Sequence, residues 1–209
     1  MTTLFWDVDT QVDFLHPDGL LHVPGSEAIL PTLKSLTNHA HAHGIRIFAS
    51  ADDHVPGHRE LSDTPDYRAT FPPHCMRGTP GQAKVQETTL RNPMVIDPSP
   101  HDPVHLAAAI RAHDGDFLFL KHWFDVFTNP NVVPAVAALA PSRIVLYGVA
   151  LEVCNRYAVE GLLRHFPAIS LAVVTDATRA LDETSRDPLL TEWTRRGVTL
   201  TTSTEVLAS

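Results

Sequence analysis

Residues 144–154 read Ile-Val-Leu-Tyr-Gly-Val-Ala-Leu-Glu-Val-Cys and contain the transition that decides the fold. The apolar run 144–147 is typical of a strand buried on both faces, as the strands of a parallel sheet are. Gly148 follows the run, and the amphipathic stretch 152–165 predicts a helix. A strand that leads directly into a helix is the repeating unit of an α/β sheet.

The same alternation recurs on both sides of this segment. Further strands are expected over residues 4–9, 46–51, 117–121, 171–175 and 198–202, and further helices over 31–43, 103–113, 132–139 and 184–196. Gly44 is placed to end the helix 31–43, and Thr184 and Gly197 are placed to cap the helix 184–196. We therefore predict a three-layer, doubly wound sheet of about six parallel strands with helices on both faces, in a single domain spanning residues 1–209.

The composition excludes several classes of protein. The chain has 24 acidic and 16 basic residues and a net charge of -8, which argues against a nucleic-acid-binding surface. No apolar run reaches the roughly 18 residues of a membrane span, and the first residues lack the basic start of a secretory signal. Two cysteines, Cys75 and Cys154, are too few for a disulfide framework. We expect a soluble cytoplasmic protein that binds neither nucleic acid nor membranes.

Polar residues follow five of the expected strands at the point where each ends. These are Asp9, Asp52 with His54, Lys121, Cys154 shortly after Gly148, and Asp176. The carboxyl ends of parallel strands line the ligand crevice of an open sheet. The Pro-rich segment 52–102 is long for a loop inside a compact domain, and such loops are usually functional. The sequence therefore predicts a site at this edge of the sheet.

Cys154 is a candidate nucleophile because it lies at the start of a predicted helix, where the helix dipole favours a thiolate. A carboxylate such as Asp9 can take the thiol proton and later deliver it to a leaving amine, and the Lys121 ammonium can hold the thiolate. Taken singly, each residue has a plainer interpretation. Cys154 can be a buried, inert thiol, and Lys121 and Asp9 can mark the points where two strands reach water.

A second group of residues has the composition of a catalytic metal site. Asp52 and His54 follow one strand, and His74 comes twenty residues later, so that one carboxylate and two imidazoles could leave a coordination position open. A His-rich loop that holds no metal is the alternative. Cys75, next to His74, is expected to be structural. Three alternating histidines on the helix 31–43 (His39, His41 and His43) are expected to be solvated, and His122 could line the cleft.

The motifs together resemble the isochorismatase-like cysteine hydrolase superfamily, and most closely its nicotinamidase-like members. The resemblance extends from residue 9 to about residue 200 and rests on five motifs in order. The matching stretches are Asp9-Thr10-Gln11-Val12-Asp13-Phe14, Asp52-Asp53-His54 with His58, Phe71-Pro72-Pro73-His74-Cys75, Lys121-His122-Trp123-Phe124-Asp125-Val126-Phe127, and Gly148-Val149-Ala150-Leu151-Glu152-Val153-Cys154.

The resemblance implies a catalytic triad of Asp9, Lys121 and Cys154. It also implies a non-proline cis peptide at Val149-Ala150 and an oxyanion hole formed by the backbone amides of Ala150 and Cys154. The implied reaction is hydrolysis of a small planar amide through a thioester, with nicotinamide, which gives nicotinate and ammonia, as the first candidate.

The same resemblance assigns a divalent metal to Asp52, His54 and His74, with zinc as the first candidate and iron or manganese as alternatives. The substrate pocket would have aromatic walls from Phe14, Phe71 and Phe124. A homo-oligomer is expected because relatives commonly form dimers or tetramers.

Some residues depart from the family pattern and leave the substrate open. Asp53 stands where the family has tryptophan and would add a negative charge beside the metal set, with His58 as a possible neighbour of the ligands. Phe71 and Phe124 stand where tryptophan and tyrosine are typical, and Leu151 and Asn155 also differ. One alternative is another activity of the superfamily, on a carbamoyl or acyclic amide or on isochorismate. The other is a catalytically silent interaction module.

Overall fold

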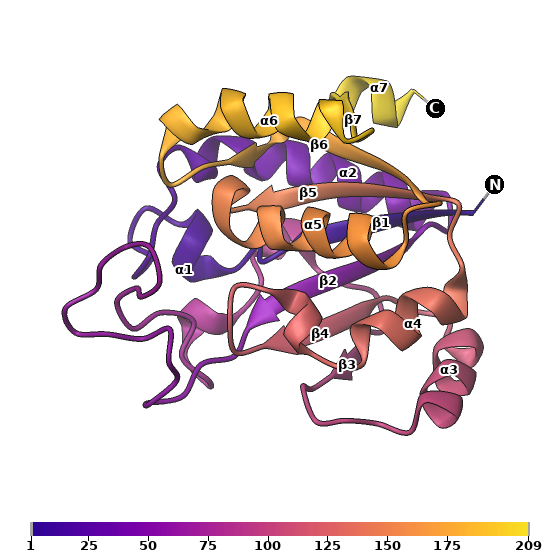
Figure 1. The fold of residues 1–209 in the computed structure, drawn as a ribbon, viewed down its shortest axis with the longest axis horizontal. Helices are drawn as coiled ribbons and strands as arrows, with labels where there is room; N and C mark the ends of the chain where they lie inside the picture. Colours follow the sequence, from indigo (N-terminus) through magenta and orange to yellow (C-terminus); the bar gives the residue numbers. More distant parts are fainter. Residues whose placement is uncertain (1, 209) are drawn as a thin grey trace.

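The computed structural model describes residues 2–208 and confirms a doubly wound α/β fold, with one strand more than expected (Figure 1). Its sheet has seven strands in the order β3-β4-β2-β1-β5-β6-β7, and every neighbouring pair is parallel. The strands are β1 (Thr3–Val8), β2 (Arg46–Asp52), β3 (Met94–Ile96), β4 (Phe117–Lys121), β5 (Arg143–Val149), β6 (Ser170–Arg179) and β7 (Thr199–Thr201). The unexpected strand is β3, which lies inside the Pro-rich segment.

Helices cover both faces of the sheet (Figure 1). They are α1 (Val12–Leu15), α2 (Leu30–Ala42), α3 (Pro103–Ala112), α4 (Val132–Leu139), α5 (Arg156–His165), α6 (Arg186–Arg195) and α7 (Ser203–Leu207). The prediction of an α-helix from residue 152 is wrong at its start, since Leu151–Asn155 form a π-helix and α5 follows it. Thr184 does not cap α6, because it lies in the 3₁₀ helix Glu183–Ser185 and its own amide donates to the Asp182 side chain.

The alternation of side chains along the strands produces two cores, one on each face. Phe5 and Trp6 are consecutive in β1 and belong to different hydrophobic clusters. Trp6 packs in the cluster that includes residues of α3, α4, α5 and α6, whereas Phe5 packs in the cluster under α2 and α7. Both rings are almost completely buried. The two cores make the sheet the middle layer of three.

The histidines of α2 differ in part from the expectation that all are solvated. His41 Nε2 lies 2.8 Å from Oδ2 of the buried Asp116, which also accepts hydrogen bonds from the backbone amides of Ile47 and Arg91. The ring of His39 stacks on Phe5. The two side chains therefore help to fix α2 against the sheet.

None of the helices within residues 2–208 is long and apolar enough to cross a membrane.

Candidate active site

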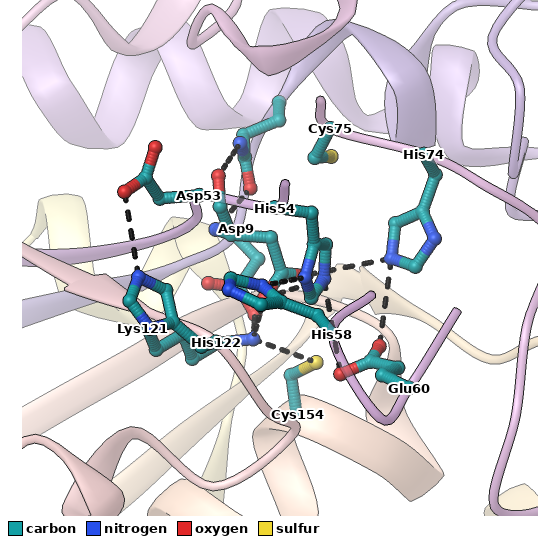
Figure 2. A network of polar contacts seen from close by, with 12 residues as sticks. Asp9, Asp53, His54, His58, Glu60, His74, Cys75, Lys121, His122 and Cys154 are labelled. Atoms are coloured by element: carbon teal, nitrogen blue, oxygen red, sulfur yellow. Dashed lines mark hydrogen bonds and ion pairs between the residues drawn. The ribbon is translucent and has the colours of Figure 1, made fainter. Parts of the chain in front are cut away.

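The carboxyl ends of β1, β4 and β5 bring together Asp9, Lys121 and Cys154, the three residues expected to form the triad (Figure 2). Lys121 Nζ lies 3.0 Å from Asp9 Oδ2 and donates to Cys154 Sγ at 3.6 Å. All three residues are buried. Asp9 has φ of 47°, a left-handed conformation that non-glycine residues rarely adopt and that often marks functional sites.

Burial and charge act in opposite directions on these groups. Burial raises the pKa of the Asp9 carboxyl and of the Cys154 thiol, and the Lys121 ammonium opposes both rises. Burial disfavours the charged form of Lys121, yet the carboxylates of Asp52 and Asp9 outweigh it and hold the pKa of this lysine well above its usual value. Lys121 is therefore a permanent cation within reach of both an acid and a thiol.

A second buried cluster adjoins this group and contains the three expected metal ligands. One oxygen of Asp52 and the Nε2 atoms of His54 and His74 lie with one oxygen of Glu60 within 4.8 Å of one another. The nitrogen–oxygen distances across the cluster are 3.5–3.8 Å. Four ligands at zinc-bonding distance in a tetrahedron are separated by about 3.4 Å. The spacing therefore fits a divalent ion.

The hydrogen bonds around the cluster leave its inner atoms free. His74 Nδ1 donates to the Pro72 carbonyl at 2.8 Å, which directs Nε2 toward the cluster. Nδ1 of His54 lies 3.2 Å from Nδ1 of His58, which also accepts from the Val55 amide, so His54 is the donor. Oδ2 of Asp52, Oε2 of Glu60 and Nε2 of both inner histidines have no hydrogen-bond partner. Unpaired buried polar atoms that converge on one point indicate a ligand position.

The charges of the site also favour a cation. Burial lowers the pKa of His54 to about 4, so its imidazole is neutral at pH 7, the form that binds metals. Burial also disfavours protonation of His74, but the nearby carboxylates of Asp52 and Glu60, at 3.7 and 3.5 Å from Nε2, outweigh it and raise the pKa of His74 to about 9. The position between the carboxylates therefore attracts positive charge, whether as a proton or as a metal ion.

Glu60 was missed by the sequence analysis. It lies six residues after His54 in irregular chain, and its carbonyl accepts the amide of Phe71 at 2.8 Å, which fixes it beside the His74 segment. No periodic pattern marks such a residue. The available signal was its charge, since a buried cluster of two histidines and one carboxylate leaves room for a fourth ligand.

The first motif fastens the two clusters to each other. Gln11 Nε2 donates to the Asp52 carbonyl at 2.9 Å, and the Asp52 amide donates to Gln11 Oε1 at 2.7 Å. Asp13 Oδ2 accepts the amide of Cys75 at 2.6 Å. A Cβ on Gly81 would collide with the Asp13 carboxylate, so this glycine permits the close approach. These contacts hold Asp52 and the His74 segment in place, and Cys75 is buried, as a structural residue would be.

The peptide bond between Val149 and Ala150 is cis, as the resemblance implies. Ala150 borders a small cavity, of about 20 Å³, that also exposes atoms of Cys154, Glu60 and His74. The rest of its lining is apolar and consists of Phe14, Leu21, Val23, Phe71, Val153 and Leu181. The cavity is thus lined both by the Cys154 thiol and by members of the cluster of Asp52, His54, Glu60 and His74, which we call the metal-type cluster. Phe124 is not among these lining residues and instead packs edge-on against Phe71, with ring centroids 5.7 Å apart.

Asp53 does not place its charge against the metal-type cluster as expected. Its carboxylate accepts hydrogen bonds from the guanidinium of Arg77 and from Gln82 Nε2, and it lies 3.5 Å from His122 Nε2. Arg77 holds the pKa of Asp53 below its usual value. Arg77 therefore compensates the negative charge of Asp53 locally. The prediction that this charge acts on the cluster of Asp52, His54, Glu60 and His74 is wrong. The His122 ring lies tilted against that of His58, with ring centroids 4.4 Å apart (Figure 2).

Comparison with known proteins identifies the family. A family model described as an isochorismatase domain matches residues 4–205, nearly the whole chain. The chain belongs to the isochorismatase family. This chain is 39% identical to the nicotinamidase/pyrazinamidase of Mycobacterium tuberculosis over 75 residues, which are 35% of this chain and 39% of that relative. The chain therefore matches well under half the length of this curated relative.

Solved structures confirm the isochorismatase-like fold. Pyrazinamidase of Pyrococcus horikoshii, solved in complex with zinc, superposes with a TM-score of 0.74 at 22% identity over 97% of this chain and 99% of that one. N-carbamoylsarcosine amidase from Thermoplasma acidophilum superposes with a TM-score of 0.71 at 21% identity over 97% of each chain. At these identities the likeness shows the fold alone. Together with the family model, it confirms the prediction of an isochorismatase-like protein.

Proposed function

We propose that this protein is a cysteine-dependent amidohydrolase that converts a small planar amide, with nicotinamide as the first candidate, to the acid and ammonia. The observation that carries the proposal is the shared cavity. Cys154, which Lys121 contacts together with Asp9, lines a mostly apolar cavity that is also lined by His74 and Glu60. Once the lining side chains move apart to enlarge the cavity beyond its about 20 Å³, one small ring could contact the thiol through its carboxamide and the second cluster through its ring nitrogen.

The proposed reaction uses Asp9 twice as a proton carrier. Asp9, Asp52 and Cys154 each offer an atom within 4.8 Å of the others, so the thiol proton can pass to Asp9 as the sulfur attacks the carbonyl carbon. The new C–S bond yields a tetrahedral oxyanion held by the amides of Ala150 and Cys154. The C–N bond then breaks, and Asp9 returns its proton to the leaving ammonia. Water, deprotonated by Asp9, hydrolyses the thioester and frees the thiol.

The cluster of Asp52, His54, Glu60 and His74 would hold a divalent metal, with zinc as the first candidate and iron or manganese as alternatives. When bound, such an ion supplies a Lewis acid that holds a ring nitrogen. The chain's own residues position it, because His58 and Pro72 orient the two imidazoles and Gln11 fixes the Asp52 backbone. The zinc named in the Pyrococcus horikoshii pyrazinamidase structure supports the choice of metal.

The cavity lining favours an uncharged aromatic amide over a carbamoyl amino acid. A substrate such as N-carbamoylsarcosine carries a carboxylate, which needs a cationic partner when buried. Among the described residues that line the cavity there is no arginine or lysine, and most of the lining is apolar. Lys121 is already engaged by two carboxylates. A single domain, a cytoplasmic location and a homo-oligomer remain proposals that rest on the sequence and the resemblance.

Ammonia release from a panel of amides tests the proposal. Nicotinamide, pyrazinamide, N-carbamoylsarcosine and an acyclic amide would be compared with the metal-loaded protein. We expect turnover of the two aromatic amides, and its loss in Cys154→Ala. Cys75→Ala is the matched control, because the other thiol of the chain is buried and lies outside the cavity lining. Full activity of Cys154→Ala would refute the mechanism, whereas turnover of only the carbamoyl or acyclic amide would refute the substrate.

A further inference from the structure

Asn155 follows Cys154 directly, and its fully buried side chain reaches back to the end of β5. Its Nδ2 donates to the carbonyl of Gly148 at 2.9 Å. Its backbone amide donates to the carbonyl of Ala150 at 3.1 Å. One residue therefore holds both ends of the segment 148–150, which connects the strand to the turn that carries the thiol.

This segment lies at the irregular end of β5. The register between β5 and β6 shifts between Leu146 and Gly148, although Gly148 still pairs with Val8 of β1 and with Thr178 of β6. Gly148 has φ of 118°, and a Cβ at this position would collide with the backbone of Val8. The Asn155 side chain adds a hydrogen bond to the Gly148 carbonyl at this irregular strand end, just before the cis peptide.

The backbone contact of Asn155 also determines the form of the turn. The Ala150 carbonyl accepts from the amides of Val153 and Asn155, in the π-helix Leu151–Asn155. In an α-helix this carbonyl would instead accept from Cys154, four residues on. Because Asn155 takes the bond, the Cys154 amide is not claimed by Ala150. Single π turns of this kind occur frequently at functional sites.

The other polar atom of Asn155 indicates why an amide stands here. Oδ1 is buried and has no hydrogen-bond partner. An unpaired buried acceptor destabilises the fold, so an apolar residue of similar size would be the better choice if packing alone mattered. The donor function of Nδ2 toward Gly148 is the feature that an apolar residue could not replace.

We propose that Asn155 is a positioning residue that holds the segment 148–150 and the following turn so that the amides of Ala150 and Cys154 face the same oxyanion. This inference rests on the proposed function, since it assigns a support to the oxyanion hole of that reaction. It assigns Asn155 no contact with substrate. Its loss should therefore affect the tetrahedral state and leave ground-state binding and the thiol itself unchanged.

Two variants separate this role from packing. Asn155→Leu keeps the branched shape and removes the donor, and Asn155→Ala removes the whole side-chain amide without introducing a charge. Each would be compared with the wild type in three measurements: kcat and KM for ammonia release, inhibition by pyridine-3-carboxaldehyde, and the rate at which iodoacetamide alkylates Cys154. The aldehyde forms a C–S bond with the thiolate and places the charge on its oxygen with no leaving group, so it reports the oxyanion hole alone. Alkylation forms no oxyanion.

We expect kcat to fall about 10–100-fold and the aldehyde inhibition constant to rise by a similar factor, since small misplacement of a catalytic group has effects of this size. KM and the alkylation rate should stay within about twofold of the wild type. A fall in kcat with an unchanged aldehyde constant, or a parallel fall in the alkylation rate, would overturn the proposal. If Asn155→Leu fails to fold, Asn155→Ala gives the same comparison.

Failure of the proposed function would look different. A wild-type protein that releases no ammonia from any amide would refute the hydrolase assignment, yet the aldehyde and alkylation measurements would still test Asn155. Weaker aldehyde binding in both variants, with unchanged alkylation, would support the positioning role even then. An unchanged aldehyde constant would refute it.

Discussion

Lys121→Met is the substitution that tests most directly how the site is held together. Methionine fills a similar volume but removes the ammonium that contacts both Asp9 and Asp52, at 3.0 and 2.5 Å. Both carboxylates and the ammonium are buried. Removing one member of such a group leaves the remaining charges uncompensated, which is the most costly way to change a buried ion pair.

The expected cost follows from the two contacts. At an effective dielectric constant of about 20, each contributes about 5–7 kcal/mol of Coulomb attraction. Most of that attraction offsets the cost of burying the three charges, so the net loss on truncation is about 3–5 kcal/mol. A domain in the middle or upper part of the usual range of about 5–15 kcal/mol remains folded after such a loss. The Lys121→Met protein should therefore fold but unfold at a clearly lower urea concentration.

Urea unfolding and the alkylation rate of Cys154 measure the two consequences. The variant should also lose reactivity toward iodoacetamide at neutral pH, because Lys121 opposes the effect of burial on the thiol pKa. Lys84→Met is the matched control. Lys84 Nζ lies 3.0 Å from Asp7 and is almost buried, so its loss should cost stability and leave the alkylation rate unchanged. Wild-type stability and reactivity in Lys121→Met would refute this account of the site.

Three further substitutions test other parts of the structure. Glu60→Gln should weaken zinc binding at least about tenfold, measured by competition with a chelator, and wild-type affinity would exclude Glu60 as a ligand. Arg77→Met removes the partner that lowers the pKa of Asp53. A carboxyl whose pKa is lowered by folding stabilises the folded state at pH values above its ordinary pKa, and this stabilisation is lost as the pH falls through the lowered pKa. Because Arg77 is more than half exposed, the difference in unfolding free energy should be below about 1 kcal/mol at pH 7, should shrink as the pH falls below 3.8, and should vanish below the lowered pKa of Asp53. Gly148→Ala should lower the free energy of unfolding by at least about 2 kcal/mol, since its Cβ would meet the Val8 backbone, and a neutral effect in thermal unfolding would contradict the close approach.

Local pattern was sufficient to predict most of the fold. The buried runs of β1, β2, β4 and β5 are long and apolar enough to be identified without their partners. The strand β3 has three residues, of which one is buried, and it exists because it pairs with β4. The π-helix after β5 also escapes a periodic pattern, since it depends on which amide the Ala150 carbonyl accepts. Elements fixed by a distant or single partner leave little signal in their own sequence.

The same distinction separates the site residues. Asp9, Lys121 and Cys154 follow strands, so the geometry of a parallel sheet was enough to predict that they meet. Glu60 and the Arg77 partner of Asp53 lie in irregular chain, and their positions depend on long-range contacts such as the amide of Phe71 with the Glu60 carbonyl. The charge of Asp53 alone gave a misleading prediction, because Arg77, 24 positions later in the sequence, pairs with its carboxylate in the fold.

Asp52 connects the two halves of the site and complicates any substitution made there. Its Oδ1 accepts from Lys121 at 2.5 Å, while Oδ2 lies 3.7 Å from Nε2 of His74. A loss of activity in an Asp52 variant would therefore combine the effects on the lysine and on the metal-type cluster. Glu60 forms ion pairs with the two histidines of the cluster but none with Lys121. Substitution of Glu60 is consequently the cleaner way to ask what the cluster contributes, because the contacts between Lys121, Asp9 and Cys154 remain in place.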